Sequence, residues 1–178
     1  MITNESRSSI HTAEITDSEM LAHAPSIFAQ APMQGVSGKY TFLPTDRIVA
    51  AMRNEGWKPI EARQSRPRLE ARRGFQLHQV RFQRRDVTAE LDEFTPEVVL
   101  INSHDRSSGY EIRAGLFRFV CRNGLMVADS LIPAIHVRHT GQELGHIIRA
   151  SFEILGQLPK LADRVASFKS VALSDRIA

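Results

Sequence analysis

Residues 98–127 read VVLINSHDRSSGYEIRAGLFRFVCRNGLMV, and this stretch decides the fold. It contains three apolar runs separated by two polar turns, one at 105–109 and one at Asn123-Gly124. An Asn-Gly pair between apolar runs is typical of a tight β-hairpin. The stretch therefore predicts antiparallel strands with polar side chains at their ends, an arrangement in which rigid strands hold a site formed by loops.

Helical patterns flank these strands on both sides. Thr45 is expected to cap a helix over 45–55 that ends at Gly56. An amphipathic pattern predicts a helix over 141–157, which Pro159 is expected to end, and a second helix over 161–171. Strands are expected at 58–65, 75–83, 98–102, 110–121, 125–127 and 134–139, with a loop over 86–97. We therefore predict an α+β fold, a mainly antiparallel sheet with an N-terminal-side helix and C-terminal helices packed on it.

The N-terminal part of the chain is polar and then rich in Pro and Gly. We expect residues 1–40 to form a flexible arm and loop, with a short helix near 17–24. Residues 41–178 are expected to form a single α+β domain, because 178 residues suffice for one hydrophobic core.

Composition narrows the class of protein. The apolar fraction is 42%, the net charge is +3 and the isoelectric point is about 9.4, which favours an anionic partner. Cys121 is the only cysteine, so an internal disulfide is excluded, as suits a reducing compartment. Because no long apolar run and no secretion signal are present, we expect a cytoplasmic protein that makes no contact with a membrane.

Arginine is concentrated between residues 63 and 85, where Glu70 is the one acidic residue. Guanidinium groups suit a phosphate backbone with exposed bases, so a hairpin carrying them predicts a nucleic-acid contact. The alternative is a solvated hairpin that the acidic residues of 86–97 partly neutralise. Arg118, which lies within an apolar run, is added as a further candidate. The candidate residues for binding nucleic acid are Arg63, Arg66, Arg68, Arg72, Arg73, Arg81, Arg84, Arg85 and Arg118.

A second candidate is the loop that follows strand 98–102. It contains Asn102, Ser103, His104 and Asp105, and Asn123 in the next turn is grouped with it. A His beside an Asp suits acid–base chemistry or a metal, provided that His78, His136 or His139 reaches the same place. The alternative is a turn stabilised by Asx and Ser side chains, which bond backbone N–H groups.

Motifs for several large enzyme classes are missing from the sequence. It has no Walker loop, no GxGxxG, no GxSxG, no CxxC and no HExxH. Cys121 lies beside Arg122, which favours a thiolate, although a small buried residue at a strand end is the simpler interpretation. We therefore expect no cofactor and no metal, and we assign no catalytic residue.

Several motifs in this order resemble one known family. The sequence resembles the domain of unknown function 932, the phage/plasmid-like protein family found on bacterial mobile elements. The resemblance covers about residues 40–170. It is carried by Pro44-Thr45 to Gly56-Trp57, 62–68, 78–82, the NSHD run at 102–105, 115–118, Cys121 to Leu125 and 137–139.

The resemblance implies a bacterial protein of a phage or plasmid that handles DNA or interferes with host defence, and it supplies no catalytic residues. Members are often longer, so a C-terminal part is expected to be missing or naturally absent. Our first hypothesis is a protein that binds nucleic acid, single-stranded DNA above all. The alternatives are an inhibitor that docks on an acidic surface of a host or phage protein, and a metal-dependent enzyme acting on nucleic acid through His104 and Asp105. The oligomeric state is left open.

Overall fold

The computed structural model describes residues 13–35, 41–67, 69–84, 94–118, 125–126, 133–137 and 143–169, and every structural statement below concerns these residues. Two helical segments come first, α1 (Asp17–His23) and the short 3-10 helix η1 (Pro25–Phe28), followed by α2 (Thr45–Asn54). Strands then alternate with turns until the long C-terminal helix α3 (Glu143–Lys169). The strands are β1 (Lys58–Gln64), β2 (His78–Gln83), β3 (Phe94–Asn102), β4 (Tyr110–Arg118), β5 (Leu125–Met126) and β6 (Ile135–Val137). A short 3-10 helix, η2 (Glu70–Arg72), lies between β1 and β2.

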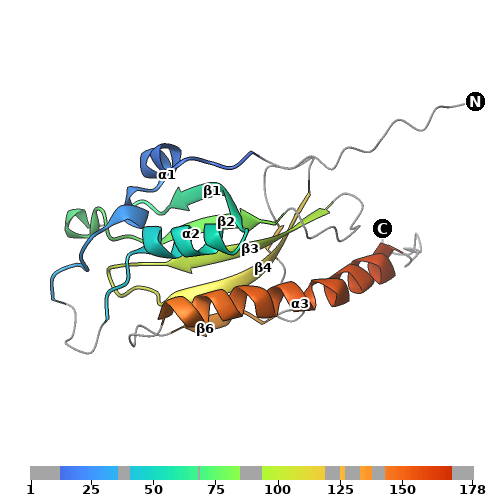
Figure 1. Cartoon of the computed structure of the whole chain (residues 1–178). Helices are drawn as coiled ribbons and strands as arrows, with labels where there is room; N and C mark the ends of the chain where they lie inside the picture. The colour runs from blue at the N-terminus through green and yellow to red at the C-terminus, as the bar shows by residue number, and fades with distance from the viewer. Residues whose placement is uncertain are drawn as a thin grey trace, which may run out of the picture.

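The described strands form one antiparallel sheet in the order β1-β2-β3-β4-β5, and β6 also pairs with β4. Figure 1 shows β1, β2, β3 and β4 side by side in this order. Cross-strand partners such as Val80 with Leu100, and Leu100 with Ile112, place apolar side chains on one face. The predicted α+β class with a mainly antiparallel sheet is therefore confirmed.

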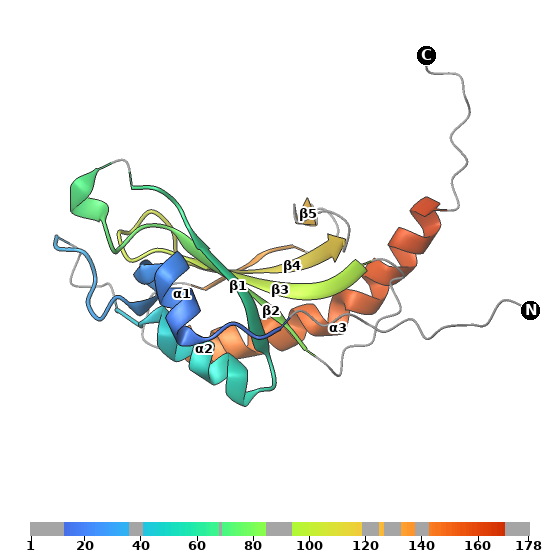
Figure 2. The same ribbon diagram turned by 90° about the horizontal axis from the view of Figure 1, so that it is seen from above.

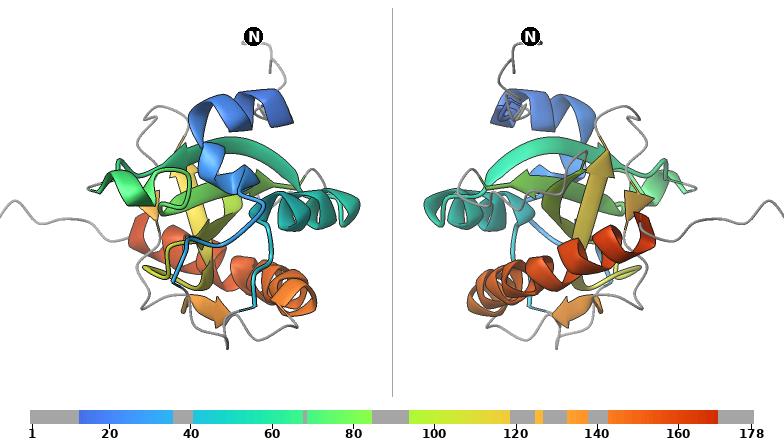
Figure 3. Two further views of the ribbon diagram at one scale, coloured as in Figure 1. Left: turned by 90° about the vertical axis from the view of Figure 1, so that its left-hand side faces the viewer. Right: turned by 90° about the vertical axis from the view of Figure 1, so that its right-hand side faces the viewer.

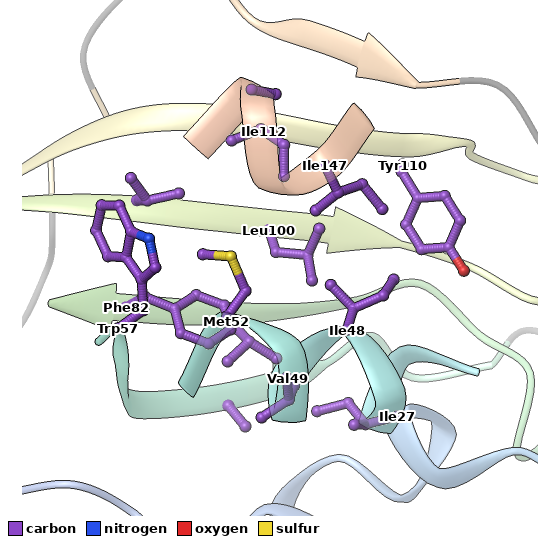
Figure 4. Packing of buried hydrophobic residues seen from close by; sticks show 14 of the residues in the cluster. Ile27, Ile48, Val49, Met52, Trp57, Phe82, Leu100, Tyr110, Ile112 and Ile147 are labelled. Carbon is purple, nitrogen blue, oxygen red and sulfur yellow. The ribbon is translucent and has the colours of Figure 1, made fainter. Parts of the chain in front are cut away.

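The hydrophobic core lies between that face of the sheet and the helices. Figure 4 shows Ile48 and Met52 of α2, Phe82, Leu100 and Ile112 of the sheet, and Ile147 of α3 packed together. Each of these side chains is at most 1% exposed, and burial of this kind stabilises by about 1.5–3 kcal/mol per large side chain. The described α-helices thus share one face of the sheet, and α1 lies beside β1 (Figure 3).

The start of α2 differs from the prediction. Pro44 is the residue before the helix, and Thr45 is its first residue, so Thr45 is not the N-cap. Its hydroxyl is buried and bonds side chains of the sheet instead. The end of α2 agrees with the prediction, because Gly56 has φ of +85° and the N–H of Trp57 bonds the carbonyl of Met52.

β3 begins earlier than predicted. Pro96 lies inside this strand and pairs in register with Leu116 of β4, although a proline there suggested a loop. The paired part of β2 ends opposite Val98, so β3 has only β4 as a described neighbour at Pro96. A strand accepts proline where one of its sides makes no ladder hydrogen bonds.

α3 also departs from the prediction. It is a single helix that runs through Pro159, where two helices were expected. Its buried face consists of Ile147, Ala150 and Ile154, whereas Leu144 and Phe152 are more than a third exposed. The amphipathic pattern over 141–157 places Leu144 and Phe152 on the apolar face of the predicted helix, and the structure shows that this is wrong for both residues.

The segment 13–35 belongs to the fold. Met20, Ala24 and Ile27 are at most 1% exposed in the common core, and the N–H of Ile15 bonds the carbonyl of Pro59. The expectation of a flexible arm therefore does not hold for these residues, although the predicted helix near 17–24 is present as α1. Among the described residues, no helix has the length and apolar character needed to cross a membrane.

Candidate functional site at the arginine end of the sheet

Two connections lie together at one end of the sheet, the β1–β2 connection (65–77, apart from residue 68) and the β3–β4 turn (103–109) (Figure 2). The N–H of His104 bonds the carbonyl of Phe75 at 2.9 Å, and Arg72 Nη1 lies 3.5 Å from Asp105 Oδ2. Four exposed arginines project from these connections. We call this surface the arginine end and define it by Arg66, Arg72, Arg73 and Arg106.

Side-chain hydrogen bonds fix the β3–β4 turn. Asp105 Oδ1 accepts hydrogen bonds from the N–H and the hydroxyl of Ser107, at 2.9 and 2.5 Å. Ser103 Oγ accepts from the N–H of Ser108 at 2.9 Å. These are the Asx and Ser bonds to backbone that the sequence suggested, so this interpretation of the loop is confirmed.

The turn stabilises the charged form of the Asp105 carboxyl group. Burial acts to raise the pKa of its carboxyl, but the hydrogen bonds from Ser107 and the nearby Arg72 outweigh burial and leave the pKa below its ordinary value. The next residue, Arg106, has φ of +66°, a conformation that non-glycine residues seldom adopt. The turn thus presents Arg106 outward while Asp105 anchors Arg72.

A buried polar network lies beneath the arginine end. Thr45 Oγ1 is within 2.9 Å of His78 Nε2, 3.2 Å of His104 Nε2 and 3.1 Å of Asn102 Nδ2. All four residues are at most 2% exposed, and the two imidazole rings are 5.2 Å apart between centroids. His78 therefore does reach the place where His104 lies.

The hydrogen-bond partners fix the direction of the network. His78 Nδ1 lies 3.0 Å from the carbonyl oxygen of Gln76, which has no proton to give, so Nδ1 carries the proton. Burial lowers the pKa of His78 to about 4, so the ring is neutral at pH 7 and its Nε2 accepts the Thr45 hydroxyl proton. His104 Nε2 must then donate to Thr45 Oγ1, as the amide of Asn102 does.

The network continues to β1 and η1. Ser26 Oγ lies 3.0 Å from His78 Nδ1 and donates to Gln64 Oε1 at 2.9 Å. Five sequence-distant segments are thereby joined through buried polar groups, and such a network stabilises the fold most when every group has a partner. The buried acceptor Asn102 Oδ1 has no hydrogen-bond partner among the described residues.

Two of the predicted arginines lie on the other face of the sheet, which no described helix covers. Arg81 bonds Glu97 at 2.6 and 2.8 Å and also pairs with Glu61, which in turn pairs with Arg63. Burial raises the pKa of Glu97, against the pull of Arg81. Carboxylates of the same face therefore hold these two guanidinium groups, from the neighbouring strands β1 and β3 for Arg81 and from its own strand β1 for Arg63.

Arg84 lies at the opposite end of α2 from the arginine end. Its guanidinium carbon is 5.5 Å from the ring centroid of Trp57 and 5.3 Å from that of Phe152, and Nη1 donates to the carbonyl of Glu55. These contacts join α2, β2 and α3. The position of Arg84 indicates a structural role rather than a contact with a ligand.

The predicted arginine cluster is thus divided among three places. The arginine end holds Arg66, Arg72 and Arg73, the open face of the sheet holds Arg63 and Arg81, and Arg84 packs with the helices. Arg68, Arg85 and Asn123 lie outside the described residues, as does the side chain of Arg118. A single continuous surface made by all these arginines is not present in the described structure.

Sequence reasoning missed Arg106 and the role of Thr45. Arg106 was visible as the basic residue of the predicted 105–109 turn, next to Asp105. Thr45 had no such signal, because its partners lie 33 and 59 residues away in the chain. Within the described part of the chain, no three His, Cys, Asp or Glu side chains are grouped as metal ligands.

Comparison with known proteins identifies relatives but no activity. The family model described as "Domain of unknown function (DUF932)" matches residues 32–178. UPF0380 protein YafZ of Escherichia coli (strain K12) is 32% identical over 160 residues, and UPF0380 protein YfjQ of the same organism is 31% identical over 160 residues. In both cases the match covers 89% of this chain and 57% of the relative, so the chain spans little more than half their length. No solved structure matches.

Proposed function

The chain belongs to the family described as Domain of unknown function (DUF932), and on the geometry of the arginine end we propose that it binds nucleic acid, single-stranded DNA above all. The setting that we propose is the bacterial cytoplasm, in a protein of a phage or plasmid, as the resemblance of its motifs implies. The observation that carries the proposal is the arginine end itself, four exposed guanidinium groups on two connections that are fixed to each other.

The local charge supports an anionic ligand. Four arginines face two described carboxylates there, those of Glu70 and Asp105, so the surface keeps a positive excess. The pair of Arg73 with Glu70 is more than 70% exposed on both sides, and such pairs contribute little and open readily to another anion. Arg66 has no ion pair with a described residue.

The test is a double variant at Arg66 and Arg73, whose exposed positions lead us to expect an intact fold when both are replaced. We expect Arg66→Gln with Arg73→Gln to weaken binding of labelled single-stranded DNA at least about tenfold in fluorescence anisotropy, because each arginine makes a charge-assisted hydrogen bond to phosphate. Parallel titrations with duplex DNA and RNA rank the ligands. The matched control is Arg47→Gln with Lys160→Gln, which removes the same charge from exposed helix positions.

The binding measurements on the two double variants distinguish between the possible outcomes. Weak binding in the first variant and unchanged binding in the control support the arginine end as the contact. Equal affinity of both variants and the unaltered protein, or no binding by any of them, overturns the proposal.

One observation favours a second candidate, a protein partner with an acidic surface. Leu69 and Leu77 of the β1–β2 connection are 60% and 38% exposed among the arginines. Exposed apolar side chains rimmed by charge are typical of protein contacts. Under this alternative, the chain captures a protein partner in a pull-down that nuclease treatment does not affect. Leu69→Ser with Leu77→Ser then abolishes capture of that partner, while affinity for DNA stays unchanged.

A further inference from the structure

A cleft lies between the edge strand β6 and the start of α3, away from the arginine end. Figure 1 and Figure 3 both show β6 beside the first turns of α3. The cleft has a volume of about 380 Å³, and its apolar part comes from Ile135, Val137 and Ala150. This volume lies in the range of small-molecule sites.

Three basic side chains line this cleft. His136 comes from β6, while His146 and Arg149 are three residues apart on α3 and therefore share one side of that helix. Arg149 Nη1 lies 3.6 Å from the place that a Cβ atom on Gly145 would occupy, so the guanidinium extends back along the first turns of α3. The helix dipole adds positive potential in the same region.

Arg149 is an uncompensated cation among the described residues. Arg53, Arg63, Arg72, Arg73, Arg81 and Arg113 each pair with a carboxylate, whereas Arg149 has no such partner in the described structure. Glu153 also lines the cleft, one helical turn beyond Arg149, without forming an ion pair with it. The site therefore offers a cationic guanidinium from Arg149, imidazole nitrogens from His136 and His146, and one separate carboxylate.

We propose that this cleft binds a phosphate monoester that also carries a hydroxyl or amino group, such as a nucleoside monophosphate; this proposal does not depend on the arginine end. The guanidinium fork and the two imidazoles suit the phosphate oxygens, which accept several hydrogen bonds at once. The Glu153 carboxylate repels a second anion and accepts a hydrogen bond from a ligand O–H or N–H. The phosphate group comes from a free mononucleotide or from the phosphorylated end of a DNA strand.

The experiment measures binding of adenosine 5′-monophosphate to the full chain by calorimetry. Arg149→Gln is expected to weaken binding at least about tenfold, and the control Arg47→Gln is expected to leave it unchanged. Glu153→Ala is expected to weaken binding of adenosine 5′-monophosphate but not of inorganic phosphate, because only the nucleotide carries hydroxyl and amino groups outside its phosphate that can donate to the carboxylate. No binding of the nucleotide, or equal binding by Arg149→Gln and the unaltered protein, overturns the proposal.

Competition identifies the source of the phosphate. Displacement of labelled adenosine 5′-monophosphate by a 5′-phosphorylated oligonucleotide, or by free mononucleotide alone, supports the site and names its ligand. Equal displacement by a 5′-hydroxyl oligonucleotide overturns it, since no phosphate monoester would then be required. Binding of the nucleotide by the Arg66→Gln, Arg73→Gln variant separates this site from the arginine end.

Discussion

The hydroxyl of Thr45 is the centre of the buried network, because three side chains from two strands and a turn bond it. A threonine at a helix start ordinarily bonds the first turn of its own helix. Here the same hydroxyl fixes α2 to the sheet beneath the arginine end. The cost of removing it is therefore set by its three partners and not by helix propensity.

Replacing Thr45 with Val keeps the shape of the side chain and removes its hydroxyl. The change removes the hydroxyl that the Nε2 atoms of His78 and His104 and the side-chain amide of Asn102 contact in the interior, and we expect the free energy of unfolding to fall by about 2 kcal/mol or more. Urea denaturation measures this loss. Thr45→Ser retains the hydroxyl and should recover most of the stability. A loss in the serine variant as large as in the valine variant would contradict the assigned role of the hydroxyl.

His78 makes stability depend on pH in the acid range. Its pKa is about 4 in the folded protein and about 6.5 in the unfolded chain, so the unfolded chain binds more protons between these values. The contribution of His78 is fully present above pH 6.5 and is lost as the pH falls toward 4, by at most about 1.4 kcal/mol per pH unit. His78→Gln should be less stable at pH 7 and should lack this part of the slope.

Urea denaturation of both proteins at several pH values isolates the effect of His78, because the carboxylates contribute equally to each. The same pH slope in the two proteins would show that His78 is not held neutral by burial.

Residue patterns predicted part of this network. Alternation along 78–82 places His78 on the buried face with Val80 and Phe82, and the structure confirms that placement. The pattern says nothing about what a buried imidazole bonds, since that depends on segments far away in the chain. The sequence therefore showed which residue is buried and not which group accepts or donates its proton.

At the scale of elements, α3 carries a proline within its length. Proline in a helix interior removes one hydrogen bond and costs about 3 kcal/mol, which is why the sequence predicted two helices. The structure shows one helix, whose first half buries Ile147, Ala150 and Ile154 against the core. The helix therefore continues through Pro159 against the local preference, and most helical stability in proteins comes from packing of this kind on an amphipathic face.

Pro159→Ala should stabilise the protein, because alanine restores the missing backbone donor and has the best helix propensity. We expect a rise in unfolding free energy of about 1–3 kcal/mol and a higher melting temperature in calorimetry. A lower melting temperature would show that the helix needs the proline.

Arg84 joins three elements through two aromatic rings and a carbonyl. Arg84→Ala should lower the free energy of unfolding by about 1–2 kcal/mol, since each cation–π contact contributes about 0.5–1 kcal/mol. Affinity for single-stranded DNA, measured on the folded variant by anisotropy, should stay unchanged. A loss of DNA affinity with no loss of stability would show that Arg84 binds DNA and does not stabilise the fold.

At the scale of the whole molecule, strand alternation explains why the arginines are divided. Arg81 and Arg63 point to the face opposite His78, where Arg81 pairs with carboxylates of both neighbouring strands and Arg63 pairs with Glu61 of its own strand. Glu97 is 16 residues from Arg81 in the chain, within a segment that the sequence predicted as loop. The fold class could be predicted from the hydrophobic pattern. The division of the arginines of 63–85 could not, because it depends on strand register, which local sequence patterns do not determine.

The salt dependence of DNA binding tests the arginine end most directly. Each phosphate contact on a single strand adds about −0.7 to the slope of log affinity against log salt concentration. We predict that Arg66→Gln with Arg73→Gln makes the slope shallower by about 1.4, whereas the control at Arg47 and Lys160 keeps the slope of the unaltered protein. The same slope in all three proteins would contradict the account, because the bound phosphates would then lie elsewhere.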